Sequence, residues 1–330
     1  MTCPNFSEPL RFHPLAGHRL LSNAAAAPVR ASGSSTNRGE MIIDFKRILF
    51  PVDMSEEDRK AAPFVKAMAG WFGSRIDMLY VHEFLFPTYS PPEDYTGTAI
   101  AIAEECRKQR QAEFGSFMIS EFATANLHRT MVDGEAAHEI ISYIKANDVG
   151  LIMMPTHGYS PFRRFLLGSV TAKVLHDVAC PVWTGVHSPE LLSENPEKCE
   201  RLLCAIDIQP ADARLIRWAA EFASIRHCEV QLVHAVQGCP ATDDEGGQPF
   251  REFLFKAAHD AIDGLQKEAG TAFEVCVRGG KPEQVVHDAA QDLGADLVVI
   301  GRGQLNHPLG RLRTHTYSII RESPRPVISV

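Results

Sequence analysis

The sequence predicts an α/β fold made of two tandem domains, each built on a doubly wound, five-stranded parallel sheet. The chain has 330 residues, which suits two domains that each bury a core. From Met41 onward, short apolar runs alternate with amphipathic stretches, as is typical of parallel strands covered on both faces by crossover helices. The same order of runs then occurs a second time.

The first domain is expected over residues 41–187. Its apolar runs predict strands near residues 46–52, 76–82, 127–132, 150–154 and 181–186. The amphipathic stretches between them predict helices near residues 56–72, 99–124, 135–147 and 168–178. Residues 1–40 are rich in Ala, Ser, Gly and Pro without apolar periodicity, so we expect a disordered N-terminal tail there.

The second domain is expected over residues 199–330. Segment 47–53, RILFPVD, matches segment 201–207, RLLCAID, and Gly134 matches Gly280. The separations are 207 − 53 = 154 and 280 − 134 = 146, a drift that small loop deletions explain. The repeat indicates a tandem duplication of one domain. Residues 188–198 are polar and hold two prolines, as an interdomain linker does.

The amino-acid composition argues against two classes of binding partner. Lys and Arg number 33 against 41 Asp and Glu, and the formal charge of −8 would repel the phosphate backbone of a nucleic acid. No apolar run approaches the roughly 20 residues that span a bilayer. We therefore expect neither nucleic acid nor a membrane as a partner.

The eight cysteines are scattered singly, without the dense spacing of a secreted disulfide framework. Cys199 with Cys204, or His227 with Cys228, lacks the spacing of a zinc site. A cytoplasmic protein without a metal centre is the simplest expectation.

A glycine-containing segment, PTHGYSPFRRFLLGSV at residues 155–170, follows the fourth predicted strand. Gly158 can take a positive φ and let backbone N–H groups approach an anion. Gly168 and Ser169 begin a predicted helix whose free N–H groups favour negative charge. Ligands of open parallel sheets bind beyond the carboxyl ends of the strands, where Asp53 also follows the first strand. The pattern indicates an anion-compatible loop, although a carboxylate at the position of Asp53 is also a common helix N-cap.

These residues resemble the nucleotide loop of the universal stress protein family. The family pattern G-x2-G-x9-G-(S/T) aligns with Pro155, Gly158, Gly168 and Ser169, and the flanking PVDMSE at residues 51–56 supports the alignment. The resemblance implies a Rossmann-like fold of the adenine nucleotide alpha hydrolase type. It also implies a stress-responsive regulatory protein that binds ATP, with Mg²⁺ only as an accompanying ion.

The resemblance also implies roles for individual residues: Asp53 contacts the nucleoside, the backbone near Val81 holds the adenine, and the loop binds ribose and phosphates. The candidate cofactor-binding residues are Pro51, Val52, Asp53, Val81, Met154, Pro155, His157, Gly158, Arg163, Gly168, Ser169 and Val170. Pro155 replaces the first glycine of the family pattern and has no N–H to donate. His157 could contact a phosphate, but a positional or solvent-exposed role is favoured for it. Arg163 could screen phosphate charge and is equally explained as a surface loop residue.

The second domain departs further from the pattern, because Arg313 and Thr314 fill the Gly-Ser position. We expect a degenerate pseudo-site there. The resemblance implies pairing through the fifth strands, residues 181–186 and 326–330, either within the chain or in a homodimer.

No nucleophile motif, metalloprotease motif or Walker loop occurs in the sequence, so we expect no catalytic residues and at most weak ATP hydrolysis. Two alternatives stay open: an interaction scaffold of the same fold that binds no nucleotide, and a slow ATPase.

Overall fold

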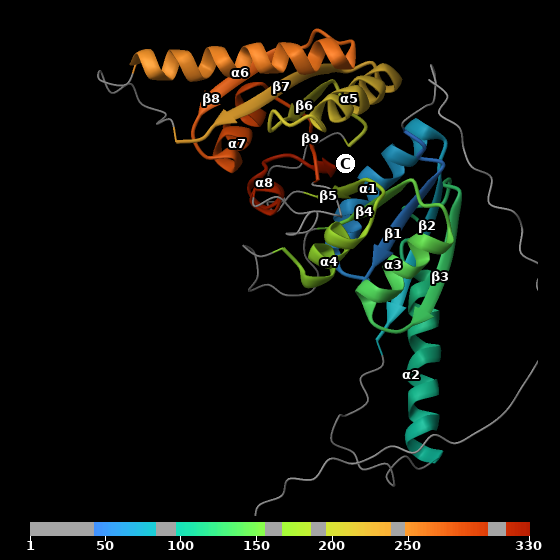
Figure 1. The fold of residues 1–330 in the computed structure, drawn as a ribbon. Coiled ribbons are helices and arrows are strands. Elements are labelled where there is room, and N and C mark those ends of the chain that lie inside the picture. The colour runs from blue at the N-terminus through green and yellow to red at the C-terminus, as the bar shows by residue number, and fades with distance from the viewer. Residues whose placement is uncertain (1–42, 84–96, 156–166, 186–195, 239–247, 303–314) are drawn as a thin grey trace, which may run out of the picture. The chain divides into compact units, whose positions relative to one another are not determined.

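Two sets of five strands alternate with helices along the chain (Figure 1). The computed structural model describes residues 43–83, 97–155, 167–185, 196–238, 248–302 and 315–330. The expected tail at residues 1–40 and most of the expected linker lie outside these residues.

The elements of the first half follow the predicted order. Its strands are β1 (Arg47–Val52), β2 (Arg75–His82), β3 (Leu127–Asp133), β4 (Leu151–Met154) and β5 (Val182–Thr184). Its helices are α1 (Glu56–Phe72), α2 (Gly97–Ser116), α3 (Ala136–Ala146) and α4 (Ser169–Asp177).

The second half repeats that order. Its strands are β6 (Arg201–Ala205), β7 (Glu229–Val236), β8 (Glu274–Gly279), β9 (Leu297–Ile300) and β10 (Val327–Ser329). Its helices are α5 (Asp212–Arg226), α6 (Gln248–Ala269), α7 (Pro282–Asp292) and α8 (Thr316–Glu322).

The strands form one ten-stranded sheet in the order β3-β2-β1-β4-β5-β10-β9-β6-β7-β8. Each half is parallel and has the doubly wound order that the sequence predicts. The fifth strands join the halves: β5 and β10 run antiparallel, with Trp183 opposite Ile328. The predicted pairing within the chain is therefore present, and a homodimer through the same strands would require this pair to separate.

Alternation along the strands divides the core into two layers. Ile48 and Phe50 of β1 belong to the layer under α1, α2, α5 and α6, whereas Leu49 belongs to the layer under α3, α4, α7 and α8 (Figure 1). Successive side chains of a strand point to opposite faces, so a strand buried on both faces is a continuous apolar run. Both layers continue from one half into the other.

Residues 41–330 form one compact unit, and polar contacts add to the strand pairing between its halves. The Arg302 guanidinium donates to the carbonyls of Leu175 (3.1 Å), Val178 (3.3 Å) and Cys180 at the C-terminal end of α4. The Tyr317 hydroxyl donates to the carbonyl of Ala172 in the same helix, at 3.2 Å. The second half therefore holds the helix that the sequence places at the candidate site.

One predicted helix is shorter than expected. The prediction extends it to residue 124, but α2 ends at Ser116 and residues 117–124 form turns. Met118 has a φ of 55°, which a right-handed helix cannot accommodate. The apolar side chains Phe117, Met118 and Phe122 are nevertheless buried, which explains why the helical pattern continues in the sequence.

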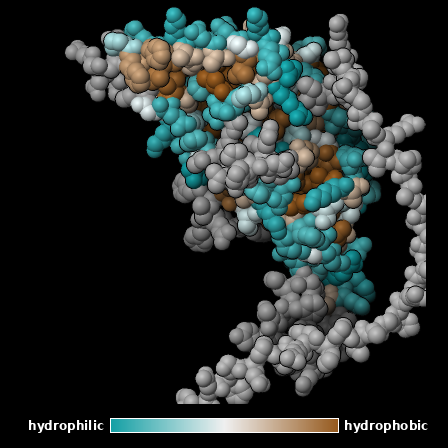
Figure 2. Space-filling model, in the orientation of Figure 1, coloured by the Kyte–Doolittle hydropathy of each residue, from teal (hydrophilic) through white to brown (hydrophobic). Residues whose placement is uncertain are grey.

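Apolar surface remains on α6 (Figure 2). Phe250 and Phe253 of this helix are 67% and 65% exposed, so they add little to the core. Within the described residues, no helix is both long enough and apolar enough to cross a membrane.

Candidate functional site

The chain after β1 is organised around a buried carboxylate. Asp58 lies in the first turn of α1 and is 1% exposed. Its Oδ2 accepts the backbone N–H groups of Asp53 (2.9 Å) and Ser55 (3.2 Å). Ser55 is the N-cap of α1 and forms a capping box with Asp58. The alternative interpretation of Asp53 as an N-cap is therefore wrong, and its exposed carboxylate lies at the end of β1, where its Oδ1 accepts the N–H of Ser55 at 3.0 Å.

Burial and the neighbouring Asp53 carboxylate raise the pKa of Asp58 to about 8, against the lowering effect of the backbone N–H donors. Near neutral pH Asp58 therefore keeps its proton while its Oδ2 accepts the two backbone N–H groups.

The second half has the same arrangement. Asp212, which is 3% exposed, accepts the N–H groups of Asp207 at 2.9 Å and Gln209 at 2.8 Å through Oδ2. Met54 and Ile208 take left-handed φ values of 65° and 57° in the two turns. The sequence analysis missed the buried aspartates, although both repeat at the offset of the matched segments, 212 − 58 = 154.

The second part of the candidate site lies where β4 gives way to α4. Met154 ends β4 and is buried, and the carbonyl of Pro155 accepts the Thr171 hydroxyl at 3.4 Å. Gly168 is the N-cap of α4 and supplies no side-chain cap. The amides of the first helical turn have no intrahelical acceptor, and such amides suit an anionic ligand.

Sheet register brings these segments to one edge. β1 and β4 are parallel neighbours, with Ile48 opposite Leu151 and Leu49 opposite Ile152. Both strands therefore end on the same side, which places Pro51, Val52 and Asp53 near Met154 and Pro155. Ser169 is exposed at the start of α4, and Val170 is partly buried beside it. His157, Gly158 and Arg163 lie outside the described residues.

The end of β2 carries a polar cluster at the same edge. Val81 is partly buried and pairs with Val132 of β3. The following residue, His82, contacts Asp133 at 3.2 Å through Nδ1, and Asp133 also pairs with Arg107 at 2.9 Å. This pairing gives His82 a structural partner.

A turn glycine holds the same place in each half. Gly134 and Gly280 have φ values of 154° and 138°, and each donates its N–H to the last carbonyl of the second strand, that of His82 at 3.2 Å or Val236 at 3.1 Å. A Cβ at Gly134 would lie 2.6 Å from Cγ of Glu139. These glycines meet the needs of the turn, and the repeat of this feature was visible in the sequence.

The corresponding edge of the second half carries two neighbouring hollows, both lined by Asp207 and Ala235. A cavity of about 40 Å³ is lined by Asp207, Asp212, Gly301, His315 and Thr316, among others. A more open groove of about 480 Å³ lies beside it and is lined by Asp207, His234 and Val236, among others. His315 Nδ1 lies 3.4 Å from a carboxylate oxygen of Glu283.

Alignment of the two halves shows that α4 and α8 begin at different positions. The offset of 326 − 181 = 145 places Thr316 opposite Thr171 and His315 opposite Val170. Both threonines are 4% exposed, so the helices occupy equivalent positions. However, α8 begins at Thr316, whereas α4 begins two positions earlier in the alignment, at Ser169.

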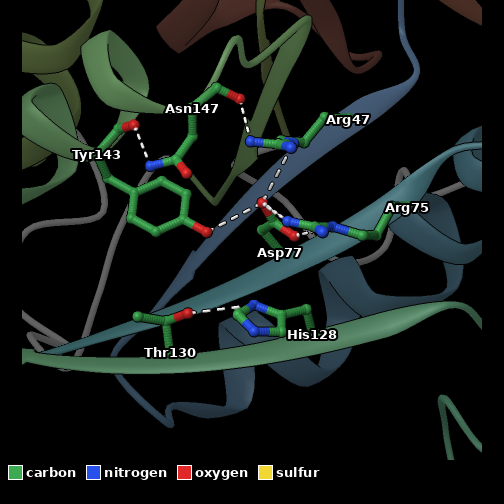
Figure 3. A network of polar contacts seen from close by, with 7 residues as sticks. All are labelled: Arg47, Arg75, Asp77, His128, Thr130, Tyr143 and Asn147. Carbon is green, nitrogen blue, oxygen red and sulfur yellow. Dashed lines mark hydrogen bonds and ion pairs between the residues drawn. The ribbon is translucent and has the colours of Figure 1, made fainter.

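A charged network lies at the opposite end of the first half, where the strands begin (Figure 3). The fully buried Asp77 carboxylate accepts hydrogen bonds from Nε–H of Arg75 at 2.7 Å and from the Tyr143 hydroxyl at 3.0 Å. It also forms an ion pair with Arg47, whose Nε lies 3.6 Å away. Burial, followed by the hydrogen bond to Asp77, raises the pKa of Tyr143. The network joins β1, β2 and α3 and compensates a buried carboxylate, which gives it a structural role.

No group of three or more His, Cys, Asp or Glu side chains in the described part of the chain is arranged to hold a metal ion.

Comparisons with known proteins agree with this architecture. The model of the universal stress protein family matches residues 44–184 and 198–330. A universal stress protein of Synechocystis sp. is 30% identical over 160 residues, which cover 48% of this chain and 96% of that protein. A universal stress protein of Thermus aquaticus is 30% identical over 141 residues, which cover 42% of this chain and 96% of that protein.

A solved structure extends the similarity to both halves. The crystal structure of a universal stress protein from Archaeoglobus fulgidus covers 87% of this chain and 98% of its own, with a TM-score of 0.59 and 19% sequence identity. At this identity the likeness concerns the fold. The family model, however, matches most of the chain in two copies, and the chain therefore belongs to the universal stress protein family as a member with tandem domains.

Proposed function

We propose that this protein is a stress-responsive regulator that binds ATP or a related adenine nucleotide in its first half and no nucleotide in its second half. The observation that carries the proposal is the start of α4 at Gly168, which leaves the amides of its first turn without a side-chain cap at the edge where Asp53 stands. Family membership and the resemblance of the loop sequence support adenine nucleotide as the ligand.

The chemistry of this edge suits a phosphorylated nucleoside. Amides of a helix start favour phosphate oxygens, and a carboxylate such as Asp53 accepts hydrogen bonds from ribose hydroxyls. A helix terminus contributes about 0.3–1 kcal/mol per charge, and up to about 2 when partly buried. Micromolar affinity needs about 8 kcal/mol, so the base and ribose have to supply most of the binding free energy.

The role of the bound nucleotide in this proposal is regulatory. The described residues at this edge include no nucleophile paired with a base, and His82 is engaged by Asp133. We therefore propose at most slow ATP hydrolysis, with Mg²⁺ only as an ion that accompanies the nucleotide.

A scaffold that binds no nucleotide is the second candidate, and Pro155 favours it. Proline has no N–H, so this residue cannot donate to a ligand at the end of β4. In this alternative the fold and the pairing of the halves are kept, while the loop serves only as a surface.

Protein purified under native conditions distinguishes the two. The proposal expects mass spectrometry to detect adenine nucleotide released on denaturation, and millimolar ATP to raise the melting temperature of nucleotide-stripped protein. Absence of both effects would favour the scaffold. Steady turnover of ATP that disappears in Asp53→Ala would instead indicate an ATPase.

A further inference from the structure

Two cysteines far apart in the sequence meet at the start of neighbouring strands in the second half. Cys199 precedes β6 and Cys228 precedes β7, with Arg201 opposite Glu229 in the parallel register. The N–H of Glu229 donates to the carbonyl of Glu200 at 2.8 Å, which fixes this end of the strand pair. Cys228 therefore lies opposite Glu200, one residue from Cys199, and each of the two thiols shifts the pKa of the other.

The surroundings differentiate the two thiols. Cys199 is 5% exposed and belongs to the apolar core, whereas Cys228 is only partly buried. The hydrogen bond from Cys199, helped by the positive charge of Arg226, lowers the pKa of Cys228. The same hydrogen bond, together with burial, raises the pKa of Cys199. Cys228 is thus the more acidic thiol of the two.

The surface gives a small reactant access to one member of the pair. Cys228 lines an open groove of about 610 Å³, together with Arg201, Glu229, Phe273 and Glu274. Cys199 lies on the core side and lines a hollow of about 20 Å³ with Trp71 and Trp183. A peroxide can reach Cys228 through the groove, whereas Cys199 is reached through Cys228.

We propose that Cys199 and Cys228 form a redox-active dithiol that hydrogen peroxide converts into a disulfide. The Cys228 thiolate attacks one peroxide oxygen, the O–O bond breaks, and hydroxide leaves, so that Cys228 becomes a sulfenic acid. The sulfur of Cys199 then attacks the sulfur of Cys228, and the sulfenic oxygen leaves as water with the Cys199 proton. In sum, two thiols and one hydrogen peroxide give one disulfide and two water molecules.

The disulfide would cross-link the N-terminal ends of β6 and β7. It would close the chain segment that contains β6 and α5, which removes conformational freedom from the unfolded state. The register of β6 with β7 already holds the two cysteines beside each other. This site is independent of the nucleotide site, which lies at the other ends of the strands.

The test uses the full chain, reduced, freed of reductant and exposed to hydrogen peroxide, followed by blocking of the remaining thiols with N-ethylmaleimide. Digestion without reductant and mass spectrometry should give a disulfide-linked peptide pair of Cys199 and Cys228 that disappears on reduction. Cys106, which is exposed and stands alone, should keep its maleimide label in the same sample. We expect loss of the Cys228 thiol to be at least about tenfold faster than loss of the Cys106 thiol.

Cysteine-to-serine variants test which thiol is oxidised first. In Cys199→Ser, the sulfenic acid of Cys228 should persist and be captured by dimedone, whereas Cys228→Ser should give no captured sulfenic acid at Cys199. Cys106→Ser serves as the matched control and should form the disulfide at the wild-type rate. The proposal is overturned if wild-type protein forms no Cys199–Cys228 disulfide while Cys106 is oxidised, or if Cys228 reacts no faster than Cys106.

Discussion

The two halves of the chain are alike after their first strands and unlike after their fourth strands. Both halves bury an aspartate, Asp58 or Asp212, which accepts two backbone N–H groups of the preceding turn. After the fourth strands, α4 starts at Ser169 behind Gly168, whereas α8 starts two aligned positions later behind His315, and neither N-cap residue supplies a side-chain cap. The first feature satisfies backbone amides in both copies, whereas the second marks the place where we propose that only the first half binds a ligand.

This contrast separates stability from binding. Loss of the buried acceptor would leave amides unsatisfied in either half, at about 1–3 kcal/mol for each buried group. A change of the helix start affects exposed or partly exposed residues and has little cost for folding. A duplicated domain can therefore lose its ligand in one copy while it keeps its architecture.

The pH dependence of stability tests the role of the buried aspartate after the first strand, and this prediction has the largest expected effect. The pKa of Asp58 is raised from 3.8 to about 8 by burial and by Asp53. Between these values the folded state keeps a proton that the unfolded state has lost, so the contribution to stability is complete below the lower value and decreases as pH rises through the window. Asp58→Asn stays neutral and keeps an acceptor oxygen for the amides.

The unfolding free energy of the wild type should therefore fall relative to that of Asp58→Asn by about 1.4 kcal/mol per pH unit within the window. Urea unfolding from about pH 5 to about pH 7.5 measures the difference. Asp44→Asn, at a carboxylate whose side chain is 61% exposed, is the control and should follow the wild type. Parallel curves for wild type and Asp58→Asn would show that Asp58 is ionised in the folded protein.

The second prediction concerns a substitution that makes the start of α4 resemble the second half. Gly168→Arg places at the start of α4 the residue type that the second half has at Arg313. The φ of Gly168 is −58°, which any residue can adopt, so the fold should be kept. We expect a loss of ATP affinity of about 100-fold, because the side chain covers the helix amides. Gly115→Arg in α2, where an added Cβ meets nothing within 4 Å, makes the same substitution away from the site and should leave binding unchanged.

The third prediction compares the two exposed aspartates at the ends of β1 and β6. Asp53→Asn should weaken ATP binding about tenfold through a poorer hydrogen-bond acceptor for the ribose. Asp207→Asn should have no effect, because the proposal places no nucleotide in the second half. Isothermal titration calorimetry measures both, and equal effects of the two substitutions would contradict the proposed division between the halves.

The smallest expected effect concerns the contact between the halves. Tyr317→Phe removes the hydroxyl that donates to the carbonyl of Ala172 in α4. We expect the free energy of unfolding to fall by about 0.5–1.5 kcal/mol and the ATP affinity to fall by no more than about threefold. A loss of binding as large as that of Gly168→Arg would mean that the second half directly shapes the site.

Sequence patterns predicted the fold well because periodicity and capping are local. The α1 helix spans Glu56–Phe72 as predicted, since Ser55 and Asp58 provide a capping box at its start. The prediction failed for α2 because a left-handed residue, Met118, ends the helix while the apolar pattern continues. Turn conformation at a non-glycine residue leaves no signal of this kind in one sequence.

The site was predictable only in part, because its contacts are set by strand register and burial. Asp53 was identified from its place after a strand, whereas the contribution of Asp58 depends on burial that the sequence alone does not show. Its repetition as Asp212 was an available signal. The Cys199–Cys228 pair arises from the register of β6 with β7. The two cysteines lie far apart in the sequence, which alone does not show that they are neighbours. The expected ligand roles of His157, Gly158 and Arg163 stay predictions.

Nucleotide stoichiometry tests the central claim most directly. Equilibrium dialysis of nucleotide-free, full-length protein against ATP should give one bound nucleotide per chain, and none at the same ATP concentrations in Gly168→Arg. Two nucleotides per chain, or one that persists in Gly168→Arg, would contradict binding at the start of α4 in the first half alone.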